Sequence, residues 1–350
     1  MQNHRIVFPL VFLFLLSTVS LSIASNEKYA KLIEGAKKEG KMVFYVSTNI
    51  DHAMSFANAF QHKYPFVKVE ILRLGSDRMT ARVLAEASAG KLGADVIQTT
   101  SVEVFLYEKK GILMKFMPME GAKFPAAAKD PDGNWVSVYE QWFIVGYNTK
   151  LVPPKDVPKT YEDLLDPKWK GKISMDGKEY RWFGTLEQIW GRKKWIDFMN
   201  RYGQQDIILR NGKTLIGQLM AAGEFALGCP LYPSDTEGLK VMGAPADTVF
   251  VDPIITNLHP FIVNSTAPHK NAAQLFVEFM LSEDGQATIA SIGRIPSFPI
   301  DITKIYPSFK GKTIPNKYPI TPRLAEQLSE RAEELRAEFR TVFVKKEKLR

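Results

Sequence analysis

The sequence of 350 residues contains one cysteine, Cys229, and five histidines. A single cysteine cannot form an internal disulfide, so the fold must depend on burial of apolar side chains, which make up 45% of the chain. The histidines beyond the N-terminal segment, His52, His62, His259 and His269, do not have the spacing of a metal site. The sequence therefore predicts no metal site and no cofactor.

Long apolar runs are also scarce, and the main one lies near the N-terminus. Residues 6–19 are mostly apolar, follow the positive charge of Arg5 and precede the small residues Ser22 and Ala24. This pattern is typical of a secretory signal peptide, and the run is shorter than the roughly 20 residues that a membrane span needs. We predict that residues 1–24 are a signal peptide and that the mature chain is exported to the periplasm.

Positive charge is abundant but not concentrated. The formal net charge is +8, yet the lysine pairs 109–110, 193–194 and 345–346 lie far apart, and no arginine-rich stripe alternates with aromatic residues. Scattered charges of this kind usually form solvated faces, which argues against a nucleic-acid partner. The sequence also lacks the internal repeats that would favour a structural or adhesive role.

Strand-like and helix-like segments alternate after Lys41. Strand-like residues 41–48, 67–75 and 94–100 are each followed by helix-like residues, 51–64, 76–90 and 101–111. Strands separated by helices pair in parallel, so the fold class is α/β with doubly wound sheets. The long strand-like stretches 135–152 and 253–265 predict two crossings between lobes.

The mature length is too great for one core, so we expect two lobes joined by a two-strand hinge. Residues 26–140 and 258–298 are assigned to the first lobe, and residues 145–255 and 299–350 to the second. Near the C-terminus, residues 324–342 place apolar side chains three and four apart. This spacing indicates one helix packed on its own lobe or, alternatively, a dimerising coiled coil. We expect a monomer.

Hydroxyl side chains follow the first three predicted strands: Ser47 and Thr48, then Ser76, then Thr100. The carboxyl ends of neighbouring parallel strands share one edge, where α/β sheets bind ligands. Each of these positions also opens a helix, and Thr100 with Glu103 fits a capping box. Helix N-termini favour an anion, so this edge predicts a polar, anion-binding pocket, although each hydroxyl alone could simply cap its helix.

The second lobe offers Arg181 between Tyr180 and Trp182, in a predicted loop after a strand. A guanidinium beside aromatic rings suits a phosphate or carboxylate attached to a planar or apolar body; a surface arginine with buried neighbours is the alternative. Tyr139 lies on the first predicted crossing and Asn257 on the second. We expect Arg181, Trp182, Tyr139 and Asn257 to contact a ligand held between the lobes.

Three stretches resemble type 2 periplasmic solute-binding proteins of ABC importers, in the extracellular solute-binding family 1 group that serves ferric iron, thiamine and phosphonate. They are VGYNTKLV at 145–152, YEDLLDPKWKGKI at 161–173 and HKNAAQLFVEFMLSEDGQ at 269–286. The resemblance runs from about Glu27 to Pro299. It implies two α/β lobes, capture of a small-molecule solute in the cleft, and delivery to an ABC importer permease in the inner membrane.

Within this resemblance, the strand end at Tyr232 distinguishes between an anionic solute and ferric iron. Iron-binding members carry two adjacent tyrosines there, whereas this chain has Tyr232 followed by Pro233. A lone phenol is a poor ferric site, so we expect Tyr232 to contact an anionic solute that bears a phosphate or carboxylate. A ferric-iron-binding transport protein with a degenerate tyrosine site remains the alternative.

An enzyme is the remaining alternative. Thiaminases share the two-lobe fold and use a cysteine nucleophile in the cleft, and Cys229 lies near the expected cleft. Its apolar surroundings, in the stretch FALGCPL, instead indicate a buried and inert thiol. We therefore expect a binding protein and not an enzyme.

Overall fold

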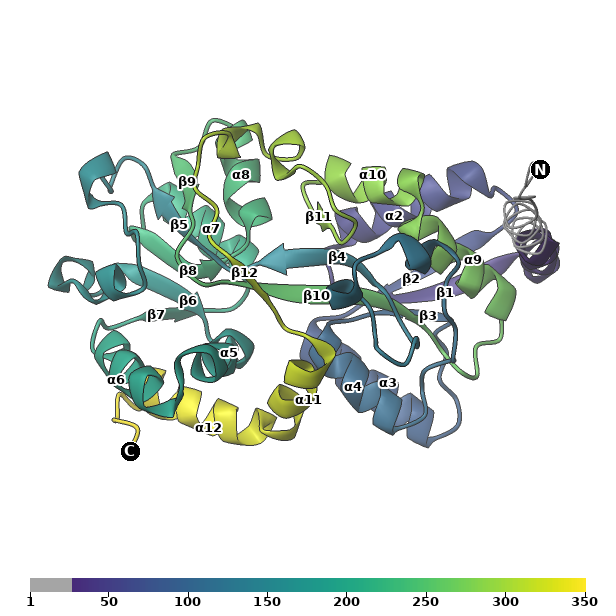
Figure 1. Cartoon of the computed structure of the whole chain (residues 1–350), viewed down its shortest axis with the longest axis horizontal. Coiled ribbons are helices and arrows are strands. Elements are labelled where there is room, and N and C mark those ends of the chain that lie inside the picture. Colours follow the sequence, from purple (N-terminus) through teal and green to yellow (C-terminus); the bar gives the residue numbers. More distant parts are fainter. Residues whose placement is uncertain (1–26) are drawn as a thin grey trace, which may run out of the picture.

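The computed structural model describes residues 27–350. The predicted signal peptide, residues 1–24, lies outside this range. Two lobes lie side by side along the long axis of the molecule, and each is built around one β-sheet (Figure 1). Between residues 27 and 350, no helix is long and apolar enough to cross a membrane.

The sheet of the first lobe confirms the predicted α/β fold class. Its strand order is β11-β4-β10-β3-β1-β2, with β12 paired to β10. The strands are β1 Lys41–Val46, β2 Lys68–Arg73, β3 Val96–Gln98, β4 Ser137–Trp142, β10 Ile254–Val263, β11 Ile295–Pro296 and β12 Lys317–Pro319. As predicted, β1 is parallel to β2 and β3, whereas β10 runs antiparallel to β3 and β4. The sheet is therefore mixed, with its antiparallel pairs where the chain crosses between lobes.

The sheet of the second lobe has the order β7-β6-β8-β5-β9. Its strands are β5 Ile144–Asn148, β6 Ile173–Asp176, β7 Ile208–Arg210, β8 Leu227–Leu231 and β9 Ala246–Val249. The strand β6 is parallel to β7 and β8, while β5 is antiparallel to β8 and β9. Both lobes thus repeat one design, in which parallel βαβ units are joined to a strand that arrives from the other lobe.

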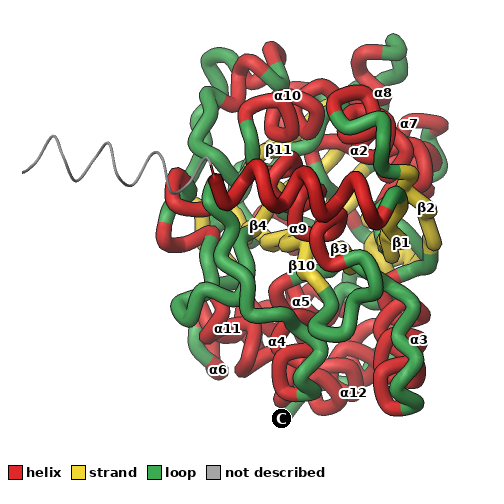
Figure 2. The backbone as a smooth tube through the Cα atoms, turned by 90° about the vertical axis from the view of Figure 1, so that its right-hand side faces the viewer, coloured by secondary structure: helices red, strands yellow, loops and turns green. Residues whose placement is uncertain are grey.

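Helices cover both sheets, and the end-on view shows strands in the interior with helices around them (Figure 2). A helix over residues 27–39 precedes β1. The other α-helices are α2 Ile50–Lys63, α3 Ser76–Ser88, α4 Ser101–Lys109, α5 Tyr180–Trp190, α6 Arg192–Gly203, α7 Lys213–Ala222, α8 Pro233–Val241, α9 Lys270–Leu281, α10 Glu283–Ser291, α11 Pro322–Glu330 and α12 Ala332–Phe343. Short 3₁₀ helices lie at Glu120–Lys123, Ala126–Ala128, Pro154–Asp156, Glu162–Leu165, Pro167–Trp169, Ile302–Lys304 and Pro307–Phe309.

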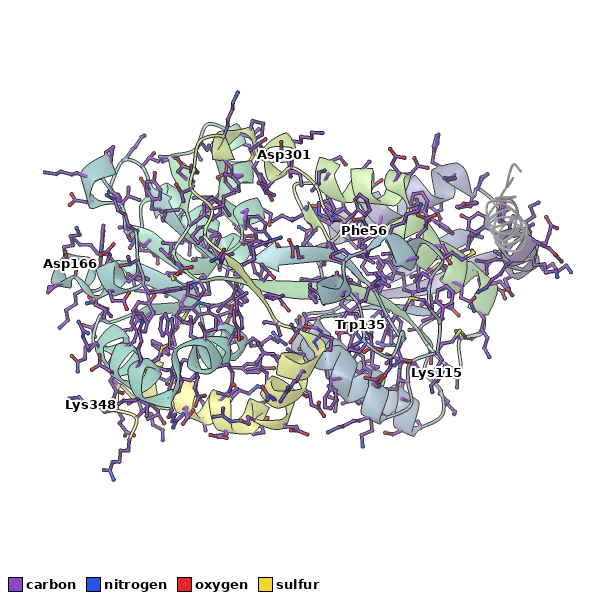
Figure 3. All side chains as sticks on the ribbon, viewed as in Figure 1. Phe56, Lys115, Trp135, Asp166, Asp301 and Lys348 are labelled. Carbon is purple, nitrogen blue, oxygen red and sulfur yellow. The ribbon has the colours of Figure 1, made fainter. Side chains whose placement is uncertain are left out.

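The helix α2 shows how the sequence pattern produces the local structure. The Asn49 side chain accepts a hydrogen bond from the His52 N–H and so caps the helix, and Phe56 and Phe60 are buried on its inner face. Figure 3 shows Phe56 inside the first lobe, whereas the exposed Asp166 and Lys348 lie at the outer edge of the second. Apolar burial at helical spacing therefore fixes which face of each helix meets its sheet.

Two chain crossings join the lobes in the stretches predicted for them. Only Phe143 separates β4 in the first sheet from β5 in the second. The return crossing follows β9, and its strand β10 pairs with β4 from Thr256 opposite Trp142 to Pro260 opposite Ser137. Figure 1 shows β4 and β10 side by side at the centre of the molecule. These paired strands form the hinge region.

The C-terminal segment differs from the single helix expected on the second lobe. It forms two helices, with Arg331 between α11 and α12. The helix α11 packs against α4 of the first lobe, where Lys109 forms an ion pair with Glu330, while α12 packs against α5 and α6 of the second. The strand β12 also lies parallel to β10 at the hinge. Residues 317–343, the C-terminal strap, therefore contact both lobes. Helical spacing in the sequence could not reveal these tertiary contacts.

Candidate ligand-binding cleft

A cavity of about 320 Å³ lies between the lobes and takes its walls from both sheets. The first lobe contributes Ser47 at the end of β1 and Ser76 at the start of α3. The second lobe contributes Arg181, Lys213 and Tyr232, all at helix starts. The volume is within the range of small-molecule sites.

Helix N-termini converge on this cavity. Gly75 and Ser76 open α3, Gly212 and Lys213 open α7, and Tyr232 is the N-cap of α8. The first backbone N–H groups of a helix have no intrahelical acceptor, and the helix dipole places partial positive charge at this end. The walls of the cavity thus carry partial positive charge from three helix N-termini, of which only that of α3 follows one of the strands whose hydroxyls predicted an anion pocket.

Five of the nine side chains predicted to contact a ligand line the cavity: Ser47, Ser76, Arg181, Tyr232 and Asn257. Four of them come from strand or helix ends on both lobes, and Asn257 comes from within β10. Whether they bind a solute stays a prediction, but the fold does bring these residues, distant in sequence, around one space.

The other four predicted side chains lie behind the cavity walls. Trp182 is fully buried in the core of the second lobe, where its indole N–H donates to the Tyr161 hydroxyl at 3.1 Å. Tyr139 is also fully buried and stacks on His259, with ring centroids 4.6 Å apart. Both rings are therefore part of the packed interior beside the cleft, and the proposed solute contacts do not include them.

Thr48 and Thr100 are held by their own lobe. The Thr48 hydroxyl accepts a hydrogen bond from Arg294, and the Thr100 hydroxyl donates to the Glu103 carboxylate. The predicted capping box is therefore wrong in detail, because Thr100 does not accept a backbone N–H of α4. Both threonines stabilise the cleft edge and do not line the cavity.

Sequence reasoning missed Lys213, which lies at the first position of α7. Its ammonium forms a buried ion pair with Glu179 and lies 4.7 Å from the Tyr232 ring centroid and 5.4 Å from that of Phe143. Burial disfavours the ammonium charge, but Glu179 together with Tyr232 and Asp176 more than offsets this effect and raises the pKa of Lys213. The signal available in the sequence was a glycine followed by lysine at a helix start after a strand, which is too common to be specific.

Phe143 and Tyr232 form an aromatic wall of the cavity. Their rings are stacked with centroids 5.5 Å apart at an interplanar angle of 25°. The sequence did not predict Phe143 as a cleft residue. Which residues of this stretch face the cleft depends on where the chain crosses between the lobes, and the sequence pattern does not fix that position. The wall offers apolar contact to the body of a solute whose charged group lies at the helix N-termini.

Arg181 is located differently from the prediction. It lies in the first turn of α5 and not in a loop, and its guanidinium forms an ion pair with Glu103 of α4 in the other lobe. Only 15% of the Arg181 side chain and 9% of the Glu103 side chain are exposed. A more exposed pair, Lys178 with Asp77 at 2.9 Å, also joins the lobes. The closed arrangement of the cleft is therefore held in part by charges of the protein itself.

Positive charge exceeds negative charge around the cavity. Five cationic and three acidic side chains line it. Within the described chain, Arg73 and Arg78 of the first lobe form no ion pair with a carboxylate, and both are exposed. After the pairs to Glu103, Glu179 and Asp77 are formed, Arg73 and Arg78 face only the carboxylate of Asp176 among the lining residues, so a small positive excess still attracts an anion.

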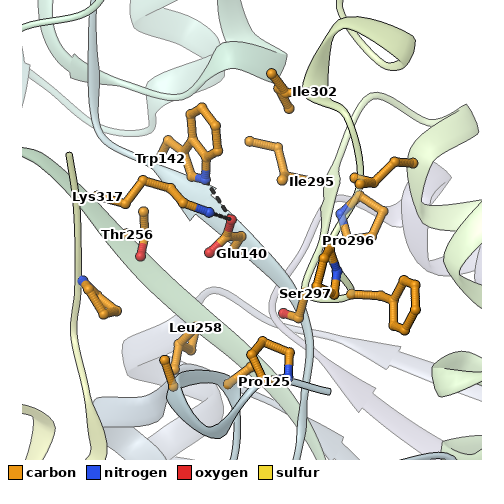
Figure 4. A pocket seen from close by; sticks show the side chains of 16 residues that line it. Pro125, Glu140, Trp142, Thr256, Leu258, Ile295, Pro296, Ser297, Ile302 and Lys317 are labelled. Atoms are coloured by element: carbon orange, nitrogen blue, oxygen red, sulfur yellow. Dashed lines mark hydrogen bonds and ion pairs between the residues drawn. The ribbon is translucent and has the colours of Figure 1, made fainter. Parts of the chain in front are cut away.

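A second cavity, of about 450 Å³, lies on the opposite face of the hinge strands (Figure 4). Glu140 and Trp142 of β4 and Thr256 and Leu258 of β10 line it, together with Lys317 of the C-terminal segment. The Glu140 carboxylate accepts hydrogen bonds from the Trp142 indole at 2.8 Å and from Lys317 at 3.1 Å. Successive strand residues point to opposite faces, so Asn257 faces the cleft while its neighbours Thr256 and Leu258 face this second cavity.

Comparison with protein families decides which group this architecture represents. Residues 55–300 match the family described as bacterial extracellular solute-binding protein. The chain belongs to this family. As a member it is the solute-binding component of an ABC transporter, a small-molecule receptor that works with a membrane permease, and proteins of this family are periplasmic in bacteria.

Relatives of this solute-binding protein include an uncharacterized protein of Haemophilus influenzae, 28% identical over 77% of this chain and 81% of the relative. Iron uptake protein A1 of Synechocystis is 25% identical over 64% of this chain and 66% of the relative.

Solved structures agree with the two-lobe fold. Iron-bound HitA from Pseudomonas aeruginosa aligns with a TM-score of 0.73 at 20% identity, covering 85% of this chain and 99% of HitA. AfuA from Actinobacillus pleuropneumoniae, with fructose-6-phosphate bound, aligns with a TM-score of 0.72 at 24% identity, covering 87% and 99%. At these identities the likeness establishes the fold of the solute-binding protein, and not its solute.

Cys229 is buried on β8, in the core of the second lobe. Burial raises the pKa of its thiol to about 12, so the nucleophilic thiolate is rare near neutral pH. Two of the similar proteins, iron uptake protein A1 and the periplasmic binding protein AfuA, are likewise named as uptake and binding proteins. These observations favour the inert thiol over the thiaminase-like alternative.

Thiol labelling provides a direct check of Cys229. We expect iodoacetamide at pH 8 to leave the folded protein unmodified, because the thiol is both inaccessible and protonated, and to modify it fully in urea. Mass spectrometry of the intact protein reads the outcome. Rapid labelling of the folded protein would instead revive the enzyme alternative.

The ion pair across the cleft can be tested with Glu103→Gln, Arg181→Gln and the double variant. Each single variant leaves one buried charge without its partner, which costs about 3–5 kcal/mol when the group stays buried. We expect the lobes of solute-free protein to separate in each single variant, so that its radius of gyration in small-angle X-ray scattering rises, and less so in the double variant.

Urea unfolding of the same three proteins supplies the energetic control for this double-mutant cycle. A radius of gyration and a stability equal to those of the parent in both single variants would show that the pair does not hold the lobes.

Proposed function

We propose that this solute-binding protein captures a small anionic solute, bearing a phosphate or a carboxylate, from the periplasm and delivers it to an ABC importer permease in the inner membrane. The predicted signal peptide supports the location. The observation that carries the proposal is the convergence of the α3, α7 and α8 N-termini on a cavity with excess positive charge. We further propose that it acts as a monomer and without a nucleic-acid partner.

The contacts proposed for the anionic group are Ser47, Ser76 and Arg181, with help from Arg73 and Lys213. Ser47 directly follows β1, and its hydroxyl donates to Gln98 Oε1 at 3.1 Å, so it contacts the anion only by exchanging this hydrogen bond for one to the solute. Hydrogen bonds to charged groups contribute about 1.5–3 kcal/mol each, and a micromolar ligand needs about 8 kcal/mol in total. Contacts from both lobes are therefore required, so the solute stabilises the closed form.

The solute bound to one structural neighbour is consistent with this chemistry. AfuA was solved with fructose-6-phosphate, a molecule with a phosphate head and a compact body. In this protein the helix N-termini would receive the head, and the stacked Phe143 and Tyr232 rings would receive the body. Asn257, at the floor between them, is the proposed polar contact to the body.

Ferric iron is the second candidate, because relatives are named iron uptake proteins and HitA was solved with iron. The cleft of this protein supplies one phenol, and burial raises the pKa of Tyr232 to about 12, which disfavours the phenolate that iron needs. Across residues 27–350, no cluster of three or more His, Cys, Asp or Glu side chains is placed to hold a metal. The geometry supports an anion better than a bare ferric ion.

The anion proposal is tested first by identifying the solute. Mass spectrometry of small molecules released from protein purified out of its native periplasm should reveal a phosphate or carboxylate compound. We expect Arg73→Gln to weaken binding of that compound roughly tenfold, the loss of one charge-assisted hydrogen bond of about 1.5 kcal/mol. Isothermal titration calorimetry measures the change.

Arg201→Gln is the matched control, since Arg201 is exposed on α6 and loses the same charge away from the cavity. Equal affinities for parent, Arg73→Gln and Arg201→Gln would argue against an anionic head at this edge. A neutral or cationic co-purified solute would do the same.

Iron binding makes a separate spectroscopic prediction. Protein mixed with ferric citrate should show no intense visible band from a phenolate bound to iron, because Tyr232 stays protonated and has no second tyrosine beside it. Such a band, present in the parent and lost in Tyr232→Phe, would establish the iron-binding alternative.

A further inference from the structure

Two buried polar side chains on β10 lie at the floor of the cleft and directly behind it. Asn257 and His259 are two residues apart and so share the face of the strand opposite to Thr256 and Leu258, which face the second cavity (Figure 4). Asn257 is 2% exposed and lines the cleft cavity; His259, the next residue on the same face, is 8% exposed. Their strand is fixed by its pairing with β4, so the positions of both side chains are fixed as well.

Each of these side chains has a buried polar atom without a hydrogen-bond partner. Within residues 27–350, neither Asn257 Oδ1 nor His259 Nε2 has an acceptor or donor in range. An unsatisfied buried polar atom costs about 1–3 kcal/mol, and such atoms are rare in native proteins. Two of them on one strand face beside a cavity indicate that a bound molecule completes their hydrogen bonds.

The neighbouring Gln98 determines which hydrogen bond His259 can make. The Gln98 Oε1 atom accepts from the Ser47 and Thr48 N–H groups, so its NH₂ group is turned toward His259 Nδ1, 3.2 Å away. Nδ1 therefore accepts, and in the neutral ring the proton lies on Nε2. Burial, with the positive charges of Arg294, Arg181 and Lys213, lowers the pKa of His259 and keeps the ring neutral. Nε2–H is thus an unused donor.

Asn257 consequently offers the cleft an unpaired acceptor, Oδ1, beside the N–H donors of its own amide, and His259 adds the donor Nε2–H just behind the cavity wall. A carboxylate or phosphate oxygen can accept from these N–H groups but leaves Asn257 Oδ1 without a donor, and an ammonium group cannot accept from His259. A hydroxyl group can both donate to Asn257 and accept from His259. The stacking of Tyr139 on His259 holds the imidazole in place, so this donor is already oriented.

We propose that Asn257 and His259 form a subsite for the hydroxyl groups of the solute, so that the solute is a hydroxylated anion such as a polyol or sugar phosphate or a sugar acid. This inference rests on the proposed function, which places the anionic head at the helix N-termini. It adds that the uncharged body of the solute is selected by hydrogen bonds at the β10 floor, and not by apolar contact with the aromatic wall alone.

The test uses pairs of probes that share charge and size but differ in hydroxyl groups. Glucose 6-phosphate is compared with cyclohexylmethyl phosphate, and gluconate with hexanoate, which also separates phosphate from carboxylate heads. In calorimetric titrations of the full mature protein, we expect the hydroxylated member of at least one pair to bind roughly tenfold tighter or more, because its analogue leaves buried polar atoms unpaired.

Asn257→Leu is the decisive variant, because it removes the acceptor with little change in side-chain volume. We expect it to abolish most of the selectivity for the hydroxylated probe while leaving the affinity for the analogue unchanged. It should also leave the melting temperature of solute-free protein unchanged or raised, because an unsatisfied buried atom is removed. A purely structural asparagine would instead lose stability. Asn257→Ser, which keeps a hydroxyl, should retain part of the selectivity.

Thr256→Val is the matched control, since Thr256 is the neighbouring residue on the opposite face of β10 and should leave selectivity unchanged. Binding of both members of each pair with equal affinity would overturn the hydroxyl subsite and leave the anion proposal standing. Equal weakening of both members in Asn257→Leu would also overturn it. Failure of the parent to bind any probe, together with a co-purified solute that carries no anionic group, would overturn the proposed function itself.

Discussion

The antiparallel pairing of β4 with β10 is the contact on which the rest of this protein depends. Both strands run through the junction of the lobes, and their backbone hydrogen bonds fix how one sheet continues into the other. Because strand side chains alternate, the same pair supplies Asn257 to the solute cleft and Thr256 to the cavity behind it. A shift of one residue in this register would exchange the two faces and remove the floor of the site.

The charges of the cleft have two opposing effects on the binding of an anion. An anion is attracted by helix N-termini and by Arg73 and Arg78, yet Arg181 and Lys213 already have carboxylate partners in Glu103 and Glu179. These pairs give each buried cation a counter-charge when no solute is bound, because an unpaired buried charge is costly. They also lower the net attraction for an anion. A receptor that must release its solute to a permease benefits from moderate attraction, and the paired cations supply it.

The C-terminal segment gives the closed arrangement a contact that does not involve solute. The helix α11 lies on α4, the helix that carries Glu103, and α12 lies on α5, the helix that carries Arg181. The strap and the ion pair therefore join the same two helices.

The sequence by itself determined the α/β class, the alternation of elements from Lys41 and the two hinge stretches, because these depend on hydrophobic periodicity and on turn residues that act locally. It also predicted the hydroxyls at strand ends and the lone tyrosine, Tyr232. Most of these features are found in the structure, because a strand end or a helix start depends on only a few neighbouring residues of the chain.

Only the tertiary structure decided which of those side chains reach the cavity. Trp182 and Arg181 are adjacent in sequence, but the turn of α5 buries the first in the core and points the second toward Glu103 of the other lobe. The surroundings of Lys213 and His259 likewise depend on residues far away in the chain. Pairings between distant segments depend on how two lobes meet, and no local pattern in the sequence contains that information.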